Sequence, residues 1–365
     1  MAVKAAIHIS DVPHLDQVND AAASLTLHAT RLTTGLDVSN GRKILPKFMV
    51  VGHRGHGMNV LQSTDKRMKV YKENSILSFN NAANLPLDFI EFDVQVTKDD
   101  TAVIFHDNFI LSEENGNVVE KRVTDLTLDE FFSYGPQRET GLVGKSLLRK
   151  SNGKIVGWNV EIDDHSCTLE EAFQKVNPCL GFNIELKFDD YIVYEQEYLI
   201  HVLQVILKVV YENAQERPVI FSSFQPDAAL LMKKLQHKYP VYFLTNGGTE
   251  IYDDVRMNSL KEAKKLAISG GLDGVVSEVK GIFRNPSVVR EIKESNLSLL
   301  TYGKLNNVPE AVHVQYLMGV EGVIVDLVQE ITSAVAGLKT GFEGENTNKI
   351  ELPFLLNLIS QLIQH

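Results

Sequence analysis

Short runs of β-branched and aromatic residues alternate along the chain with longer segments whose apolar residues recur at helical spacing. The runs predict eight strands, at residues 49–52, 89–94, 182–186, 219–223, 241–244, 274–276, 297–301 and 322–325. Predicted helix starts lie at Thr168 and Ser259, each three residues before a glutamate that can complete a capping box, and at Asn285 before Pro286. Eight such units predict an α/β fold, a closed (β/α)8 TIM barrel.

The second predicted strand is followed too closely by another β-rich run to leave room for a crossover helix. Residues 89–96 and 102–106 are therefore expected to form an antiparallel hairpin. If Asp99 and Asp100 make a two-residue loop, opposing residues have numbers that sum to 199, which places Asp93 opposite His106. The hairpin thus predicts a carboxylate and an imidazole side by side at a strand end.

Three segments fall outside the regular alternation. Residues 1–46 are a predicted N-terminal extension to a barrel domain at 47–338. Within that domain, residues 108–164 are too long for a plain barrel loop, and we expect a small inserted cap that sets the size of the ligand without supplying catalytic groups. Residues 339–365 are predicted to be a polar linker and an amphipathic helix, which packs on the barrel or on an oligomer partner in preference to a membrane surface.

Composition narrows the class of protein. With 365 residues, 44% of them hydrophobic and 23% charged, the chain is typical of a globular protein. The formal net charge of −11 argues against non-specific binding to nucleic acid or to an anionic membrane. Any anionic ligand must therefore meet local positive charge, from a metal or from a few arginines and lysines. The sequence has no uninterrupted apolar run of about 18 residues, so no stable membrane insertion is expected.

The two cysteines and the N-terminal stretch indicate the cellular compartment in which the protein is expected. Cys167 and Cys179 are too few for a disulfide framework in a chain of this size and are expected to be free thiols in a reducing compartment. The stretch to residue 46 has few arginines and carries Asp11, Asp16 and Asp20, unlike a secretory signal or an acid-poor transit peptide. The expected location is cytoplasmic, with a plastid left open.

Charged residues gather at the ends of predicted strands, where a barrel places its active site. Glu91 and Asp93 are two residues apart, so on one strand both carboxylates point the same way, and Glu185 and Lys187 repeat this spacing on the next barrel strand. Three carboxylates beside a lysine predict a site for a hard divalent cation, Mg²⁺ or Ca²⁺. The alternative, a buried ion-pair cluster without a ligand, is disfavoured because burying several charges is costly.

Two of the eleven histidines differ from the rest because each closes a predicted strand beside a charged residue. His53 precedes Arg54, and His106 precedes Asp107. Such neighbours can hold an imidazole in one tautomer or anchor a phosphate. The glycines around His53 allow a sharp turn and the close approach of a ligand.

Seven short motifs occur in a fixed order between residues 48 and 327. They are Gly52-His53-Arg54-Gly55, Glu73-Asn74, Glu91-Phe-Asp93-Val, Lys98-Asp99, His106-Asp107, Glu185-Leu-Lys187 and Ser223-Phe224. Together they resemble the motifs of the glycerophosphodiester phosphodiesterase family, and the whole chain is similar to its plant enzymes. The resemblance implies metal-dependent hydrolysis of diesters such as glycerophosphocholine, glycerophosphoethanolamine and glycerophosphoinositol to sn-glycerol 3-phosphate and the alcohol.

The resemblance also implies a role for each residue. It implies acid/base catalysis by His53 and His106, with His106 favoured as the base because of its carboxylate neighbour, although the assignment is left open. The remaining implied roles are a divalent cation held by Glu91, Asp93 and Glu185, and substrate binding by Arg54, Glu73, Lys187, Phe224 and Tyr302.

Three departures from the family pattern limit this transfer. A longer basic loop at residues 58–72 precedes Glu73 and puts its exact role in doubt. Residues 108–117 replace a common Arg-Thr-Thr pattern, and Tyr302 stands where many members carry a tryptophan on the seventh strand.

Two other functions stay open. One is a barrel phosphodiesterase that acts on lysophospholipid or phospholipid head groups, which would need an apolar rim. The basic loop at residues 58–72 and the apolar tail within residues 339–365 keep this function open. A non-catalytic barrel used for binding is disfavoured because the histidines, carboxylates and cations are all present. The expected partner is a small phosphodiester, with no nucleic acid and with a homo-oligomer left open.

Overall fold

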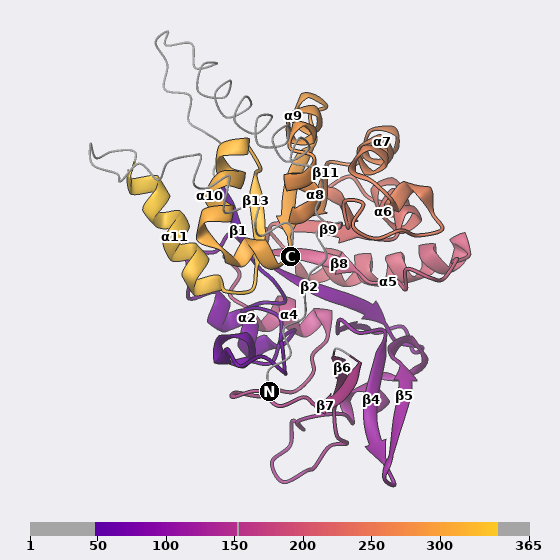
Figure 1. Ribbon diagram of the computed structural model, residues 1–365. Coiled ribbons are helices and arrows are strands. Elements are labelled where there is room, and N and C mark those ends of the chain that lie inside the picture. Colours follow the sequence, from indigo (N-terminus) through magenta and orange to yellow (C-terminus); the bar gives the residue numbers. More distant parts are fainter. Residues whose placement is uncertain (1–47, 152, 342–365) are drawn as a thin grey trace, which may run out of the picture.

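A barrel of eight parallel strands forms the centre of the computed structural model, which describes residues 48–151 and 153–341 (Figure 1). Around the barrel the strands are β1 (Met49–Gly52), β2 (Phe89–Val96), β8 (Gly181–Leu186), β9 (Val219–Ser223), β10 (Val241–Thr245), β11 (Gly274–Glu278), β12 (Ser298–Tyr302) and β13 (Gly322–Val325). β1 pairs with both β13 and β2, which closes the barrel. The predicted (β/α)8 barrel is confirmed, and each predicted strand is present with bounds that shift by two residues at most.

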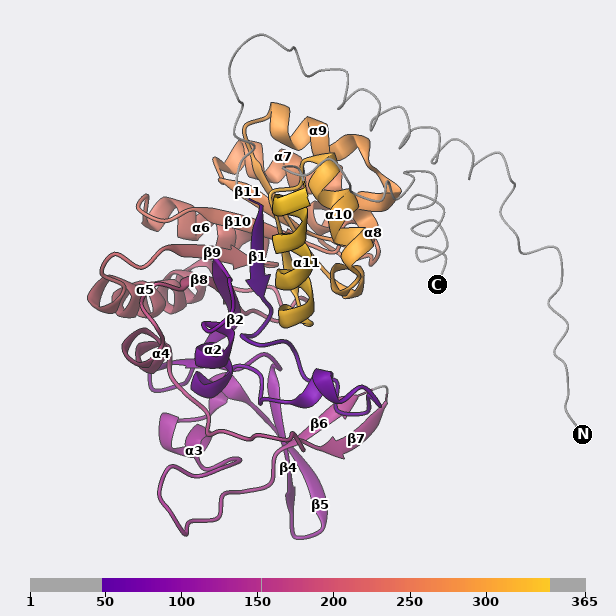
Figure 2. The same cartoon turned by 90° about the vertical axis from the view of Figure 1, so that its left-hand side faces the viewer.

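Helices cover the outside of this barrel, as two perpendicular views show (Figures 1 and 2). They are α2 (Ile76–Ala82), α4 (Leu169–Lys175), α5 (Gln196–Asn213), α6 (Pro226–Leu235), α7 (Leu260–Gly270), α8 (Val279–Arg284), α9 (Ser287–Glu294), α10 (Pro309–Met318) and α11 (Val328–Gly341), with short 3-10 helices η2 (Lys66–Lys69), η4 (Val255–Met257) and η5 (Lys304–Asn307). None of the described helices is long and apolar enough to cross a membrane.

Helix starts follow the predicted capping chemistry with one exception. Thr168 and Glu171 form the capping box of α4, and the Ser259 side chain accepts a hydrogen bond from the Glu262 N–H at the start of α7. The prediction that Asn285 begins a helix is wrong. Its backbone N–H instead closes the end of α8, and α9 starts only after Pro286, which has no N–H of its own to donate.

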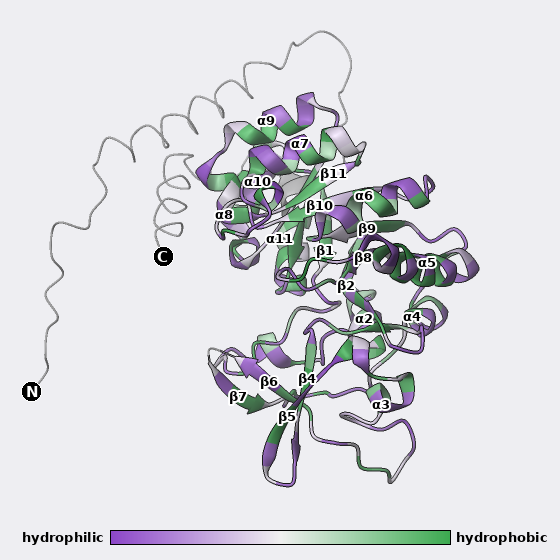
Figure 3. Cartoon of the chain, turned by 90° about the vertical axis from the view of Figure 1, so that its right-hand side faces the viewer, coloured by the Kyte–Doolittle hydropathy of each residue, from purple (hydrophilic) through white to green (hydrophobic). Residues whose placement is uncertain are grey.

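Apolar side chains fill two layers around the strands. Inside the barrel lie Val51, Ile220, Tyr242, Leu244, Val276, Leu300 and Ile324. Between strands and helices, the rings of Phe92 and Phe182 meet edge-on at 5.0 Å, and both side chains are fully buried. Burying one such side chain contributes about 1.5–3 kcal/mol. Figure 3 shows the same division, with hydrophobic residues along the strands and along one side of α5.

The hairpin after β2 is present, but its register differs from the prediction. β3 (Ala102–Ile104) is antiparallel to β2, with Val94 opposite Ile104, so opposing numbers sum to 198. The loop has three residues, and its last residue, Asp100, takes the left-handed φ of +59° that such loops use. Phe105, not His106, therefore lies opposite Asp93, and its N–H donates to the Asp93 carbonyl at 3.0 Å.

A second, four-stranded antiparallel sheet lies within the segment predicted to be a cap. Its strands, in spatial order, are β5 (Asn117–Arg122), β4 (Phe109–Glu114), β6 (Leu148–Ser151) and β7 (Lys154–Gly157), accompanied by η3 (Val123–Asp125) and α3 (Leu128–Phe132). Figures 1 and 2 both show this cap sheet projecting from one end of the barrel. Its small apolar core includes Val103 and Phe105, so the cap sheet packs on the β2–β3 hairpin.

The two ends of the chain lie outside the described residues. The predicted extension at residues 1–46 and the predicted tail helix after Pro353 fall there. α11 continues through Gly341, so residues 339–341, which were predicted to begin the polar linker, are helical.

Candidate active site

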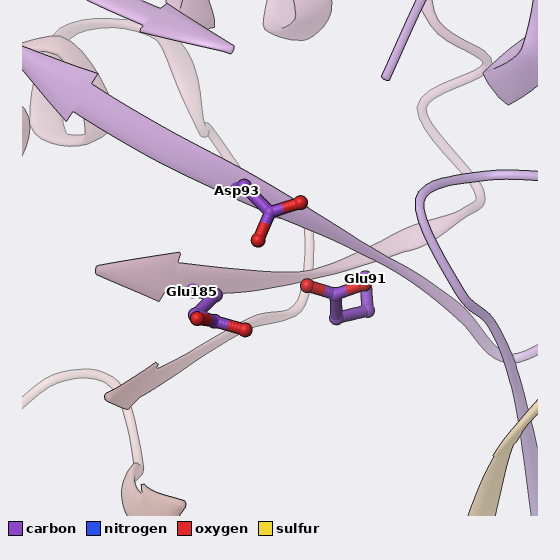
Figure 4. A group of neighbouring side chains, drawn as sticks. All are labelled: Glu91, Asp93 and Glu185. Atoms are coloured by element: carbon purple, nitrogen blue, oxygen red, sulfur yellow. The ribbon is translucent and has the colours of Figure 1, made fainter. Parts of the chain in front are cut away.

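Three carboxylates meet where β2 and β8 run side by side (Figure 4). Glu91 and Asp93 lie on β2, and Glu185 is paired with Asp93 on β8. One oxygen atom from each residue lies within 4.8 Å of the other two, and all three residues are buried. Oε1 of Glu91 is buried and has no hydrogen-bond partner among the described residues. A donor set made only of oxygens, one of them unpaired, fits a hard divalent cation.

Electrostatics supports the same interpretation of this acidic cluster. Burial and the neighbouring charges of Asp93 and Glu185 raise the pKa of Glu91 to about 8. The ammonium group of Lys187 compensates only in part, at 2.9 Å from Oε1 of Glu185 and 3.7 Å from Oδ1 of Asp93. A bound cation relieves the repulsion between the carboxylates and favours their charged forms. The cluster is therefore better explained as a cation site than as a self-sufficient set of ion pairs.

His53 follows β1 and is held by a carboxylate from the neighbouring strand. Its Nδ1 lies 2.7 Å from Oδ1 of Asp326, the residue after β13, and its Nε2 lies 3.8 Å from Oε2 of Glu91. Burial disfavours the charged imidazole, but the charge and hydrogen bond of Asp326 outweigh it, so the pKa of His53 is raised. Asp326 is itself fixed by hydrogen bonds from the Met58 N–H and the Asn307 side chain.

Arg54 sits in a left-handed backbone conformation, with φ of +51°, that non-glycine residues rarely adopt. Its N–H donates to Oε2 of Glu91 at 3.0 Å, and its Nη1 donates to Oε1 of Glu73 at 2.7 Å. The turn continues through Gly57, where a β-carbon would lie 2.3 Å from the Asp326 carbonyl oxygen. Backbone strain of this kind persists only where several bonds enforce it, which is common at active sites.

His106 lies just beyond β3, in surroundings opposite in charge to those of His53. Its Nδ1 is 2.7 Å from Oδ1 of Asp107. Burial and the nearby cations Arg54 and Lys187 hold the pKa of His106 well below its usual value. Of the two imidazoles, His53 thus favours the protonated form and His106 the neutral form.

Both histidines line one pocket of about 280 Å³, together with Arg54, Lys187 and two aromatic residues. The aromatic residues are Phe224 and Tyr302, whose rings meet at 90° with centroids 5.9 Å apart. A second pocket of about 490 Å³ shares His106, Lys187 and Phe224 with the first and extends to the cap sheet through Phe109, Leu111 and Glu120. The two pockets together are large enough for a small diester with one end at the barrel and the other near the cap.

Glu73 lies behind this pocket and does not line it. One carboxylate oxygen accepts the bond from Arg54, and the other accepts from Nη1 of Arg149 at 3.0 Å and from the Asn59 N–H. Burial opposes ionisation of Glu73, but the two arginines outweigh it and lower its pKa to about 2. Both oxygens of Glu73 are thus bonded to the protein, and one of them holds the guanidinium of Arg54.

The structure gathers nine of the ten residues that the sequence singled out around the acidic cluster and its pocket, with Glu73 one contact behind. Two further residues were missed. Asp326 could have been found, because it is an acid directly after the eighth strand, where barrel active sites lie. Arg149 gives no such signal, because it lies on β6 of the cap sheet and reaches the site only through the tertiary fold.

Comparisons with known proteins agree with this fold. The sequence model of the glycerophosphoryl diester phosphodiesterase family matches residues 53–330. Two solved structures share the fold: a glycerophosphodiester phosphodiesterase from Parabacteroides distasonis (22% identity, TM-score 0.56, 80% of this chain and 99% of that chain) and an Oleispira antarctica phosphodiesterase in complex with the product sn-glycerol-3-phosphate (18%, 0.56, 80% and 97%).

Curated relatives match over almost the whole chain. Identity is 57% to glycerophosphodiester phosphodiesterase GDPD1, chloroplastic, of Arabidopsis thaliana, over 100% of both chains, and 56% to GDPD2 of the same plant, over 98% of both. Identity to glycerophosphocholine phosphodiesterase GPCPD1 of Mus musculus is 30%, over 86% of this chain and 49% of the mouse protein. The chain therefore belongs to the glycerophosphoryl diester phosphodiesterase family, and the resemblance seen in its motifs is confirmed.

Proposed function

We propose that the protein hydrolyses glycerophosphodiesters to sn-glycerol 3-phosphate and a free alcohol, with Mg²⁺ or Ca²⁺ as cofactor. One observation carries the proposal: two imidazoles, each with its Nδ1 2.7 Å from an aspartate oxygen, line a single pocket that also borders the carboxylate cluster. Extensive identity to the Arabidopsis enzymes supports the substrate class.

The two histidines divide the proton transfers between them. His106 is neutral and acts as the general base that takes a proton from the nucleophile, because its pKa lies well below the usual value. His53 is protonated and gives its proton to the departing alcohol oxygen as the bond from phosphorus to that oxygen breaks. Each such group typically contributes about 10²–10⁴-fold to the rate.

The remaining residues bind the phosphate and orient the substrate. Glu91, Asp93 and Glu185 hold the divalent cation, which, when bound, offsets negative charge on the phosphate oxygens. Arg54 and Lys187 add positive charge at the same pocket. Phe224 and Tyr302 flank the substrate, and Glu73 keeps the guanidinium of Arg54 in place.

The test is hydrolysis of glycerophosphocholine by the purified protein, with and without a chelator. Chelation is expected to lower the rate at least about 100-fold, and added Mg²⁺ or Ca²⁺ to restore it, because the donors are all hard oxygens. Glu91→Gln should lose cation binding in calorimetry together with activity. An unchanged rate after complete chelation contradicts the cation assignment, and no hydrolysis of any glycerophosphodiester with either ion contradicts the function.

A second candidate function, hydrolysis of lysophospholipids, is favoured by one surface feature. Tyr191 and Tyr252 line the larger pocket, and Tyr191 is 83% exposed. Val193 lies two residues after Tyr191 and is 97% exposed, and Ile251 directly precedes Tyr252 and is 78% exposed. Such a rim could accept an acyl chain. Equal or greater kcat/KM for lysophosphatidylcholine than for glycerophosphocholine would favour this function, and Val193→Asp should then weaken only the lipid reaction.

A plastid location is proposed for the same chain on the basis of the Arabidopsis relative named chloroplastic. The full chain with a fluorescent protein at its C-terminus should give a signal that coincides with chlorophyll in leaf cells. A diffuse signal throughout the cytosol would instead support the cytoplasmic location that the sequence predicts.

A further inference from the structure

The cap sheet reaches the active site through Arg149 of β6. Although charged, this residue is only 9% exposed. Its Nη1 donates to Oε2 of Glu73 at 3.0 Å, and its Nη2 donates to Oδ1 of Asp107 at 2.9 Å. Its guanidinium carbon lies 4.4 Å from the ring centroid of Trp158, which limits its freedom to turn away. Arg149 is thus held in one orientation between the buried carboxylate of Glu73 and the half-buried carboxylate of Asp107.

Each of these carboxylates contacts a residue of the proposed chemistry. The Asp107 oxygen bonded to Arg149 is the atom that lies 2.7 Å from Nδ1 of His106. The opposite oxygen of Glu73 accepts the bond from Arg54. One planar guanidinium therefore fixes the spacing between the groups that orient His106 and Arg54. A lysine, with its compact ammonium on a flexible stem, does not reproduce this two-pronged geometry.

We propose that Arg149 is a positioning residue through which the cap sheet orients His106, and through Glu73 also Arg54, for the reaction. This inference rests on the proposed function. Held by Arg149, Asp107 accepts a hydrogen bond from the Nδ1–H of His106, which keeps the proton on Nδ1 and leaves Nε2 as the basic atom. Without Arg149, the Asp107 side chain, already 25% exposed, is free to turn toward water and no longer fixes the imidazole. The cap then completes the active site and does more than cover it.

A matched control exists on the same inserted segment. Arg138 also stacks over an aromatic ring, that of Phe132 at 4.0 Å, and also forms a salt bridge with a carboxylate of the barrel, Glu171 of α4. In the described part of the chain, its hydrogen-bond partners Glu171 and the Ser166 carbonyl lie outside the catalytic network. Arg138→Met therefore removes another salt bridge between this segment and the barrel, although a more exposed one, without touching His106 or Arg54.

The experiment compares Arg149→Met, Arg149→Lys and Arg138→Met with the unmodified protein, using glycerophosphocholine. Arg149→Met is expected to lower kcat about 100-fold with KM changed less than about threefold, because misplaced catalytic groups cost rate more than binding. Arg149→Lys should lose about tenfold, since it keeps the charge but not both bonds. Arg138→Met should keep kcat within about threefold, and its Tm should fall less than that of Arg149→Met, because the Arg138 side chain is 37% exposed and that of Arg149 only 11%. Equal kcat for Arg149→Met and Arg138→Met overturns the inference.

Two measurements without turnover separate this inference from the proposed function. Nitrogen NMR of the imidazoles should show a single tautomer of His106 in the unmodified protein and in Arg138→Met, but a mixture in Arg149→Met. Calorimetric affinity for Mg²⁺ should stay within about threefold in all variants, because Arg149 contacts none of the three carboxylates proposed as ligands. Should the unmodified protein hydrolyse no glycerophosphodiester, the function fails and the NMR comparison still decides the role of Arg149. The inference is overturned if the His106 tautomer signals of Arg149→Met and the unmodified protein are identical, or if Arg149→Met loses Mg²⁺ affinity as much as it loses activity.

Discussion

The surroundings of His53 and His106 are built by different parts of the molecule. His53 directly follows β1, and its partner Asp326 directly follows β13, the strand paired with β1, so the ends of two adjacent barrel strands fix this imidazole. His106 lies beyond the β2–β3 hairpin, outside the eight barrel strands, and its partner Asp107 is held by Arg149 of the cap sheet. One half of the proposed acid/base pair thus depends on the barrel alone, and the other half depends on an inserted segment.

The same comparison explains the opposite proton affinities. Asp326 and Glu91 place negative charge beside His53 and favour the imidazolium form. Burial disfavours the charged form of both imidazoles, and near His106 the positive charges of Arg54 and Lys187 add to this effect, so that the neutral form is favoured. Environments that push the pKa values of two titratable groups apart are how enzymes assign acid and base roles. The difference between the two regions is therefore the physical basis for the proposed mechanism.

Removal of either imidazole is the strongest test of this comparison. His53→Ala and His106→Ala should each cost roughly 3–5 kcal/mol of transition-state stabilisation, and the double variant should cost much less than the sum, since the two groups act as a unit. A nitrophenyl diester has a good leaving group that needs no proton, so it should rescue His53→Ala and not His106→Ala. The measurement is kcat/KM on both substrates for all three variants.

Two outcomes would contradict the division of labour. Near-normal rates in both single variants would remove the two-histidine mechanism, although family membership would stand. Rescue of both variants to the same extent would mean that neither histidine is specifically the acid. Rescue of His106→Ala alone would exchange the two roles.

Loss of the Asp326 charge should have a smaller effect that is specific to the barrel side. Activity needs neutral His106, at a pH above its pKa, and protonated His53, at a pH below its pKa, so the pH profile of kcat/KM is bell-shaped. Because Asp326 raises the pKa of His53, Asp326→Asn should move the alkaline limb to lower pH and reduce kcat about tenfold. The acidic limb, which reports His106, should stay in place. An alkaline limb that does not move would show that it belongs to another group.

Much of this arrangement could be predicted from local sequence patterns. Strand periodicity located the barrel, and the spacing of Glu91 and Asp93 placed two carboxylates on one side of β2 because side chains on a strand alternate. Predictions failed where backbone geometry intervened. The left-handed Asp100 added one residue to the hairpin loop, which moved Asp93 opposite Phe105 in place of His106. A shift of one residue in strand register changes every facing pair.

Contacts between distant segments could not be predicted from the sequence. Arg149 is 76 residues from Glu73 and 42 from Asp107, and no local pattern distinguishes it from other arginines. The bonds that Glu73 accepts from Arg54 and Arg149 span 19 and 76 residues, so the sequence alone could not show that both oxygens of this carboxylate are bonded to arginines. Local patterns therefore locate catalytic residues on strands better than they locate the residues that hold them.

The smallest expected effect concerns the alcohol end of the substrate, where the cap sheet and the barrel again contribute differently. Phe109 of β4 and Phe224 of the barrel both line the larger pocket, but only Phe224 also lines the pocket that holds the histidines. Phe109→Ala should change the ratio of kcat/KM between two glycerophosphodiesters, one with inositol and one with a second glycerol as the alcohol, about three- to fivefold. The substitution enlarges only the outer end of the pocket, where the alcohol is expected to lie.

Phe224→Ala is the matched barrel variant and should lower kcat/KM for both alcohols alike, because every substrate passes the ring beside Tyr302. Cation affinity should not change in either variant, because neither ring belongs to the carboxylate cluster. If Phe109→Ala slows every diester equally, the cap does not select the alcohol. If Phe224→Ala alters only the preference among alcohols, the inner pocket is not where the common glycerophosphate part binds, and the boundary drawn between the two pockets is wrong.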